Sequence, residues 1–252
     1  MKRIVFALLL LAGLLCVLPA SALEIISGQY IGSGGATGES LAGDRFRSFA
    51  PTAGDENYLG VPGLGTAANR VAQNLSWMTD PGNPLTSFDF TFQYDQANDR
   101  LVSTIFGGTI YWNNWSTSLA SRGKTTGADD LNAFQMSITL RDANSNVYLT
   151  DMVLDGTALG SGSFYGVMGT TQNWLVTGSD MNLTDGFTMT GRLWLQGPFG
   201  ASQENSAVNL SAGWDSRGVY PDAPVPEPAT VGLLGLGLLS MAATRIRKRK
   251  TA

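Results

Sequence analysis

Residues 87–95 read SFDFTFQYD, and this stretch alternates aromatic and polar side chains without a break. Its aromatic members are Phe88, Phe90, Phe92 and Tyr94. A period of two residues places successive side chains on opposite faces of a β-strand. We therefore expect a strand with one buried aromatic face and one wet, polar face.

The flanking sequence continues this pattern. Turn-forming residues at 96–99 separate the strand from an apolar stretch at 100–106, which predicts a β-hairpin. Residues 134–140 and 147–154 flank a second turn at 142–146, which predicts a second hairpin. We expect further strands at 24–31, 69–77, 109–115, 173–177, 187–195 and 207–214.

Short alternating strands between clusters of Gly, Asn and Asp are typical of an all-β fold. We predict an antiparallel β-sandwich or jelly-roll-like body. Residues 33–65 are rich in Gly and small side chains, so we expect long loops there with room for one edge strand. Trp77, Trp174, Trp194 and Trp214 lie in or beside apolar strand patterns and are expected in the core.

The composition excludes several classes of function. The chain has 252 residues and no His, which removes Ser-His-Asp and Cys-His catalysis and the usual zinc and copper ligand sets. Its one Cys, Cys16, lies in the N-terminal apolar segment, so we expect no disulfide in the body. Residues 23–223 carry 19 acidic and 9 basic side chains, and this balance argues against nucleic acid as a partner.

The N-terminus has the order of a secretory signal peptide. Lys2 and Arg3 precede an apolar stretch at 4–18, and the small-residue site Ala20-Ser21-Ala22 follows. We predict a signal helix at residues 1–22, cleavage by signal peptidase after Ala22, and export of the body at 23–223.

The C-terminus, residues 224–252, has three ordered parts. The motif Pro226-Glu227-Pro228 comes first, then an uncharged run at 229–243, and then the basic cluster Arg245, Arg247, Lys248, Arg249 and Lys250. As a helix, the 15 residues of the run would reach about 23 Å, which is short of the roughly 30 Å hydrocarbon core of a bilayer. We expect a short hydrophobic helix that anchors the chain in the membrane only transiently.

This tail resembles the PEP-CTERM sorting signal of Gram-negative bacteria. The resemblance implies recognition by an exosortase, a membrane enzyme that processes the chain near the Pro-Glu-Pro motif. It also implies a location at the cell envelope or surface, or in the extracellular matrix, often beside exopolysaccharide. A plain single-pass anchor with a Pro-rich linker is the alternative. The body resembles the ectodomains grouped as choice-of-anchor domains.

Two groups of residues in the body are candidate sites. Tyr111, Trp112 and Trp115 lie among Asn residues, a mixture that suits carbohydrate contact, although core packing explains them too. Asp142, Asn144 and Asn146 have the spacing of oxygen ligands in a calcium loop. Val147 and Val153 depart from that pattern, and a turn explains the same residues.

From these observations we predict a non-enzymatic protein of the cell surface or biofilm matrix, without a required cofactor. A carbohydrate-binding module is the alternative. A carboxylate-dependent glycosidase is a third hypothesis, and it needs two facing carboxylates roughly 5 to 9.5 Å apart. Glu204, in the polar loop at 202–206, is the candidate for one of them.

Overall fold

The computed structural model describes residues 23–50, 55–61, 63–75, 77, 85–120, 131–178, 181–199 and 206–218. Residues Ala22–Tyr220 form one compact unit. The signal helix, the C-terminal hydrophobic helix and the exact boundaries of the body lie outside the described residues and stay predictions.

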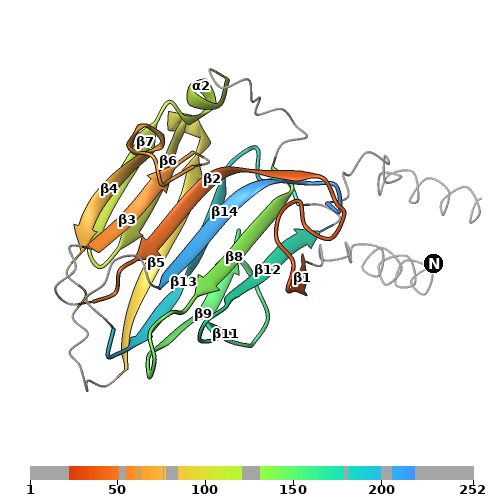
Figure 1. The fold of residues 1–252 in the computed structure, drawn as a ribbon. Coiled ribbons are helices and arrows are strands. Elements are labelled where there is room, and N and C mark those ends of the chain that lie inside the picture. The colour runs from red at the N-terminus through yellow and green to blue at the C-terminus, as the bar shows by residue number, and fades with distance from the viewer. Residues whose placement is uncertain are drawn as a thin grey trace, which may run out of the picture. The chain divides into compact units, whose positions relative to one another are not determined.

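The described chain forms two antiparallel β-sheets, which confirms the all-β fold (Figure 1). Sheet A has the strand order β1 (Leu23–Ser27), β12 (Thr171–Gly178), β8 (Ala133–Thr139), β14 (Ala207–Asp215), β2 (Gly38–Arg47), β3 (Asp55–Gly60) and β4 (Arg70–Leu75). Sheet B has the order β10 (Thr157–Ala158), β9 (Asn146–Leu154), β13 (Phe187–Gln196), β5 (Thr86–Asp95), β6 (Arg100–Ile105) and β7 (Gly108–Asn113), and β11 (Phe164–Tyr165) also pairs with β9. The helical pieces are η1 (Ala67–Asn69), η2 (Gln96–Asn98) and α2 (Trp115–Ala120).

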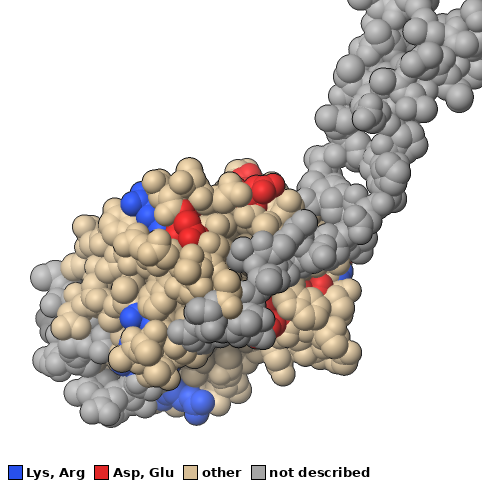
Figure 2. Space-filling view, turned by 90° about the horizontal axis from the view of Figure 1, so that it is seen from above, with Lys and Arg blue, Asp and Glu red and all other residues tan. Residues whose placement is uncertain are grey.

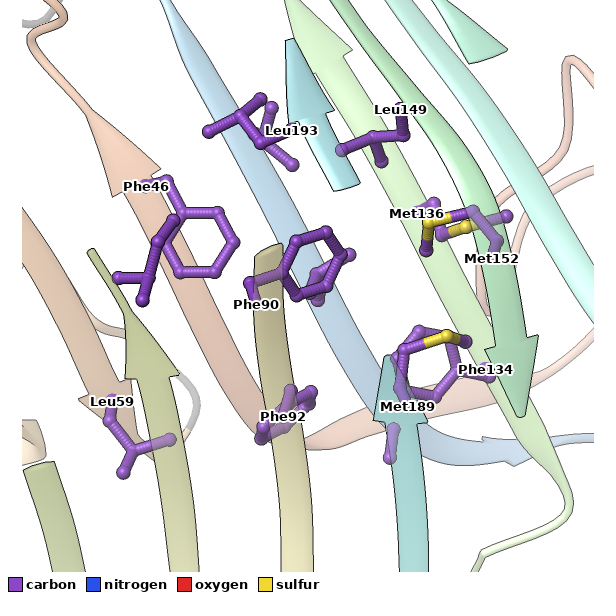
Figure 3. Close-up of a cluster of buried hydrophobic side chains, with 14 of the residues drawn as sticks. Phe46, Leu59, Phe90, Phe92, Phe134, Met136, Leu149, Met152, Met189 and Leu193 are labelled. Atoms are coloured by element: carbon purple, nitrogen blue, oxygen red, sulfur yellow. The ribbon is translucent and has the colours of Figure 1, made fainter. Parts of the chain in front are cut away.

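The core lies between the two sheets, where aromatic and Met side chains from both sides meet (Figure 3). Phe92 of sheet B lies with its ring centroid 6.0 Å from that of Phe134 in sheet A. Phe46 of sheet A contacts Phe90 of sheet B edge to face, with the centroids 5.3 Å apart. These contacts across the layers make the fold a β-sandwich.

The hairpin predicted from residues 87–106 is confirmed. Strand β5 pairs with β6 from Phe90 opposite Ile105 to Asp95 opposite Arg100. The aromatic set of β5 is buried and its polar set faces outward. At the turn, Asp99 adopts a left-handed conformation with φ 45°, which Asp tolerates better than most residues.

The second predicted hairpin is wrong. Strand β8 belongs to sheet A, where it pairs with β12 and β14, whereas β9 belongs to sheet B. The turn at 141–145 therefore carries the chain from one sheet to the other. A turn signal shows that the chain changes direction, and it does not show which sheet the next strand joins.

The loops expected at 33–65 are also wrong in part, because this segment contains β2 and β3. Strand β2 is an interior strand between β14 and β3. Its pattern was hidden by Asp44, a charged residue that occupies an inward, fully buried position opposite Leu210.

The strand predicted at 109–115 ends earlier than expected. β7 stops at Asn113, and Trp115 begins the short helix α2. Within the described ranges, no helix has the length and apolarity needed to cross a membrane.

Candidate functional site

The outward face of sheet B combines aromatic rings with a polar hollow. Strand β13 supplies the centre of this face, because its alternation directs Met189, Gly191 and Leu193 into the core and the residues between them outward. The side chains of Thr190, Arg192 and Trp194 point outward from β13.

An aromatic row crosses three neighbouring strands of this face. It consists of Tyr165 on β11, Tyr148 on β9 and Trp194 on β13, which are direct cross-strand partners. The ring centroids lie 5.2 Å apart for Tyr165 and Tyr148, and 5.7 Å apart for Tyr148 and Trp194. Tyr165 is 57% exposed. The row thus presents aromatic surface to the solvent.

A hollow of about 370 Å³ lies next to the aromatic row and extends from β9 and β13 across β5 to β6. Its polar lining residues are Asp89, Thr91, Thr104, Asp151, Thr190 and Arg192. Arg192 Nε donates a hydrogen bond of 2.8 Å to Asp89 Oδ1 across the β5–β13 pair. The hollow therefore offers carboxylates, hydroxyls and one guanidinium group.

Asp151 faces this hollow because of an irregularity in β9. The register of β9 against β13 shifts between Thr190 and Arg192, and Asp151 adopts a left-handed conformation with φ 54°. A bulge of this kind redirects a side chain that a regular strand would place on the other face.

Hydrogen bonds join the aromatic row to the hollow. Trp194 Nε1 donates to Thr150 Oγ1 at 2.8 Å, and the Thr150 hydroxyl donates to Asp151 Oδ2 at 3.1 Å. The Arg192 guanidinium lies 5.9 Å from the centroid of the Trp194 ring. Row and hollow thus form one continuous surface, which we call the sheet B site.

Two groups in the site have shifted pKa values. The hydrogen bond that Arg192 donates to Asp89 raises the pKa of Arg192 above its ordinary value, and the charges of Asp89 and Asp151 add to this rise. Partial burial raises the pKa of Tyr148, and the neighbouring Tyr165 contributes. Arg192 therefore stays a cation, and Tyr148 stays neutral, at any physiological pH.

The aromatic residues singled out from the sequence lie apart from this row. Tyr111 is 44% exposed on the outward face of β7, with the Arg100 guanidinium 4.8 Å from its ring centroid. Trp112 points to the opposite face and packs partly buried against the core. Trp115 is fully buried, and its Nε1 donates to Leu41 O at 3.3 Å. Of the three, Tyr111 presents the most surface to a ligand.

Trp194 was expected in the core, and this prediction is wrong. It shares the outward phase of β13 with Thr190 and Arg192. The sequence contained the signal, because a Trp in register with Thr and Arg belongs to the wet face of an alternating strand. The expectation for Trp77 is confirmed, since it is 1% exposed, and Trp174 and Trp214 pack partly buried against the core.

The residues of the calcium hypothesis form the crossover between the sheets. Asp142 Oδ2 accepts a hydrogen bond from Ser206 Oγ at 2.7 Å, and Asn146 Nδ2 donates to Gln196 Oε1 at 2.8 Å. Asn144 is left-handed with φ 64°. Among the described residues, no three His, Cys, Asp or Glu side chains gather in a group that could hold a metal. Calcium at this turn stays a prediction and would have to compete with these hydrogen bonds.

Charge is sparse on the surface. In Figure 2 the described residues on the face in view carry few charged side chains, and uncharged surface separates them. Among these described residues, neither the acidic nor the basic side chains form a continuous stripe. Proteins that bind nucleic acid normally present a continuous basic stripe.

Comparison with known proteins identifies the tail. Residues 224–249 match the family model of the PEP-CTERM protein-sorting motif. A search of the curated proteins found no match to the chain. The motif marks an exported protein that an exosortase sorts to the cell surface, and its residues lie outside the described ones.

Proposed function

We propose that this exported exosortase substrate is a non-enzymatic protein of the cell surface or the biofilm matrix of a Gram-negative bacterium. Its body contacts exopolysaccharide through the sheet B site. Signal peptidase removes residues 1–22, and the run at 229–243 anchors the chain in the membrane until the exosortase processes it.

The aromatic row carries the proposal for the body. The C–H faces of sugar rings are apolar and pack on aromatic rings, while their hydroxyls need hydrogen-bonding groups at the edge. The row supplies the rings, and the adjoining hollow supplies Thr hydroxyls, carboxylates and a guanidinium group. The absence of His from the chain supports contact over catalysis.

Retention on the organism's own exopolysaccharide tests this proposal. Trp194→Ala is expected to weaken retention of the mature protein, while Tyr111→Ala is the matched control on the same outward face. Both variants should remain folded, because neither side chain lies in the core, and circular dichroism checks this. Equal retention of the wild type and Trp194→Ala would contradict a role for the row.

The processing step has its own test. The intact mass of the protein from its native organism is expected to correspond to a chain that lacks residues 1–22 and the basic cluster at 245–250. A C-terminus that still ends in Thr251-Ala252 would favour the plain membrane anchor.

A glycosidase is the second candidate, because two carboxylates, Asp89 and Asp151, line the same hollow. The ion pair between Asp89 and Arg192 weakens it, since Asp89 Oδ1 already accepts a hydrogen bond from Arg192 and must exchange this partner for a substrate. Asp151→Asn separates the two functions. A glycosidase would lose hydrolysis of the native polysaccharide, whereas a binding protein shows no hydrolysis in either form. Glu204, the carboxylate singled out from the sequence, lies outside the described residues.

A further inference from the structure

The surroundings of Trp194 define a subsite for one sugar ring. Tyr148 stacks against Trp194 with an angle of 8° between the ring planes, so one face of the indole is covered. On the other side, the cross-strand partner of Trp194 is Ser87, which is exposed and carries a short side chain. Across the β5–β13 pair the second face of the indole therefore meets only this short side chain, and the Arg192 guanidinium flanks the face 5.9 Å from the ring centroid.

Polar groups stand at the edge of this subsite. Asp89 is two residues beyond Ser87 on the outward face of β5, and it is held by Arg192. A ring that stacks on Trp194 above Ser87 therefore has hydroxyl partners on its hollow side. A carboxylate accepts from a sugar hydroxyl, and a guanidinium donates to one.

The charge of the hollow limits which sugar can bind. Among its described lining residues, Asp89 and Asp151 oppose the single cation Arg192. Arg192 Nε already bonds Asp89, so the charge of this cation is partly neutralised before a ligand arrives, while its Nη groups can still donate to a hydroxyl. A uronate or sulfated sugar would bring a further negative charge to a site with an excess negative charge, and such juxtaposition opposes binding.

We propose that the sheet B site selects neutral polysaccharide: one uncharged sugar ring stacks on Trp194 above Ser87, with its hydroxyls bound at Asp89 and Arg192. This inference rests on the proposed function and adds the chemical class of the ligand.

The test uses exopolysaccharide from the native organism, separated by anion exchange into neutral and acidic fractions. Each fraction is immobilised in a native gel, and migration of the mature protein is measured. The neutral fraction is expected to retard the wild type, with little change as salt is raised, because no net ionic attraction is involved. The acidic fraction is expected to leave migration unchanged.

Two variants test the subsite, and neither removes a side chain from the hydrophobic core. Trp194→Ala removes the stacking surface and is expected to weaken retardation about tenfold. Ser87→Trp fills the space above the indole, removes none of the polar groups and is expected to abolish retardation. Tyr111→Ala, outside the subsite, should migrate as the wild type does.

A charge-reversing variant examines the selectivity. Asp89→Asn combined with Asp151→Asn leaves Arg192 as the one charged group of the described lining, and it is expected to gain retardation by the acidic fraction. If the acidic fraction retards the wild type more strongly than the neutral one, the inference fails and the proposed function stands. If neither fraction retards the wild type, both fail.

Discussion

Two regions of the sandwich bury an aspartate completely, and the pKa of the carboxyl group shifts in opposite directions in the two. Asp215, at the end of β14, and Asp44, in the middle of β2, are each 0% exposed. Asp215 lies in a dense set of hydrogen bonds with Arg217, Gly32 and Asn132, which we call the end clasp. Asp44 lies between the sheets beside Asn57 and Ser103, which we call the interior cluster.

In the end clasp the carboxylate of Asp215 accepts several short hydrogen bonds. Arg217 holds both carboxylate oxygens of Asp215, with Nε and Nη2 each at 2.7 Å. The backbone N–H of Gly32 adds a bond of 2.8 Å. Burial by itself raises the pKa of Asp215, but the bonds from Arg217 and Gly32 outweigh it and leave this pKa below its ordinary value.

In the interior cluster the donors are few. Asn57 Nδ2 donates to Ser103 Oγ at 2.7 Å. Among the described residues, neither oxygen of Asp44 has a hydrogen bond of good geometry, although Ser103 and the backbone of Arg45 lie close enough to act on its charge. Burial raises the pKa of Asp44 well above its ordinary value, and those two groups offset the rise only in part. Partners, and not burial alone, decide the charge of a buried carboxyl group.

The largest effect is expected for Asp215→Ala. The change leaves Arg217 without its counter-charge, and because the Arg217 side chain is 25% exposed we expect a loss near the lower end of the about 3–5 kcal/mol that breaking a fully buried pair costs. Urea denaturation at neutral pH measures the loss in unfolding free energy. The matched control is Asp89→Ala, whose pair with Arg192 has Asp89 78% exposed, and it should cost less than about 1 kcal/mol. Equal losses for the two variants would show that burial of the pair does not matter.

An intermediate effect is expected for Ser103→Ala in the interior cluster. The buried amide of Asn57 loses its acceptor, and an unsatisfied buried donor costs about 1–3 kcal/mol. The same denaturation experiment applies. Ser87→Ala, an exposed serine on a neighbouring strand of sheet B, is the control and should change the unfolding free energy by less than about 0.5 kcal/mol. A Ser103 variant as stable as this control would mean that the cluster is held by other bonds.

The smallest effect, with the opposite sign, is expected for Asp44→Asn. A raised pKa means that the stability from Asp44 is complete below its unfolded pKa of about 3.9 and is lost as pH rises through the folded value. Asn cannot ionise, so the variant should be more stable than the wild type at neutral pH by about 1 kcal/mol and should lack this decline.

Unfolding free energies measured from acid to alkaline pH check the Asp44 variant. Asp215→Asn gives the contrast, because a lowered pKa contributes stability above the unfolded pKa and loses it as pH falls through the folded value. That variant should be less stable at neutral pH and should lack the acid decline. If Asp44→Asn and Asp215→Asn change the unfolding free energy in the same direction, the proposed difference between the end clasp and the interior cluster is wrong.

An unbroken alternation of apolar and polar side chains makes a strand easy to predict from the sequence. β5 and β13 alternate along their whole length, and both were found close to their actual bounds. β2 was missed because Asp44 places a charge in the inward phase, where the pattern requires an apolar residue. Asp44 therefore both places a buried carboxyl group in β2 and breaks the pattern by which the strand could have been predicted.

The candidate site was predictable only in part. The phase of β13 would have put Trp194 outward beside Arg192, but no local pattern places Tyr148 and Tyr165 next to it. That neighbourhood depends on β9 joining sheet B, whereas the sequence favoured a hairpin of residues 147–154 with 134–140. Tyr111, Trp112 and Trp115 were chosen because they are close together in the sequence, but the structure separates them. Strand β7 directs the adjacent Tyr111 and Trp112 to opposite faces, and a helix begins at Trp115.

The sequence by itself determined the sorting tail and the phase of most strands, because each of these depends on residues that are close neighbours along the chain. Only the tertiary structure decided which sheet each strand joins, which aromatic rings share a face, and in which direction the pKa of each buried aspartate shifts. Asp215 binds Gly32 across 183 residues, and Trp194 binds Thr150 across 44. Strand pairing and local electrostatics depend on such distant partners, and these partners come together only when the chain folds.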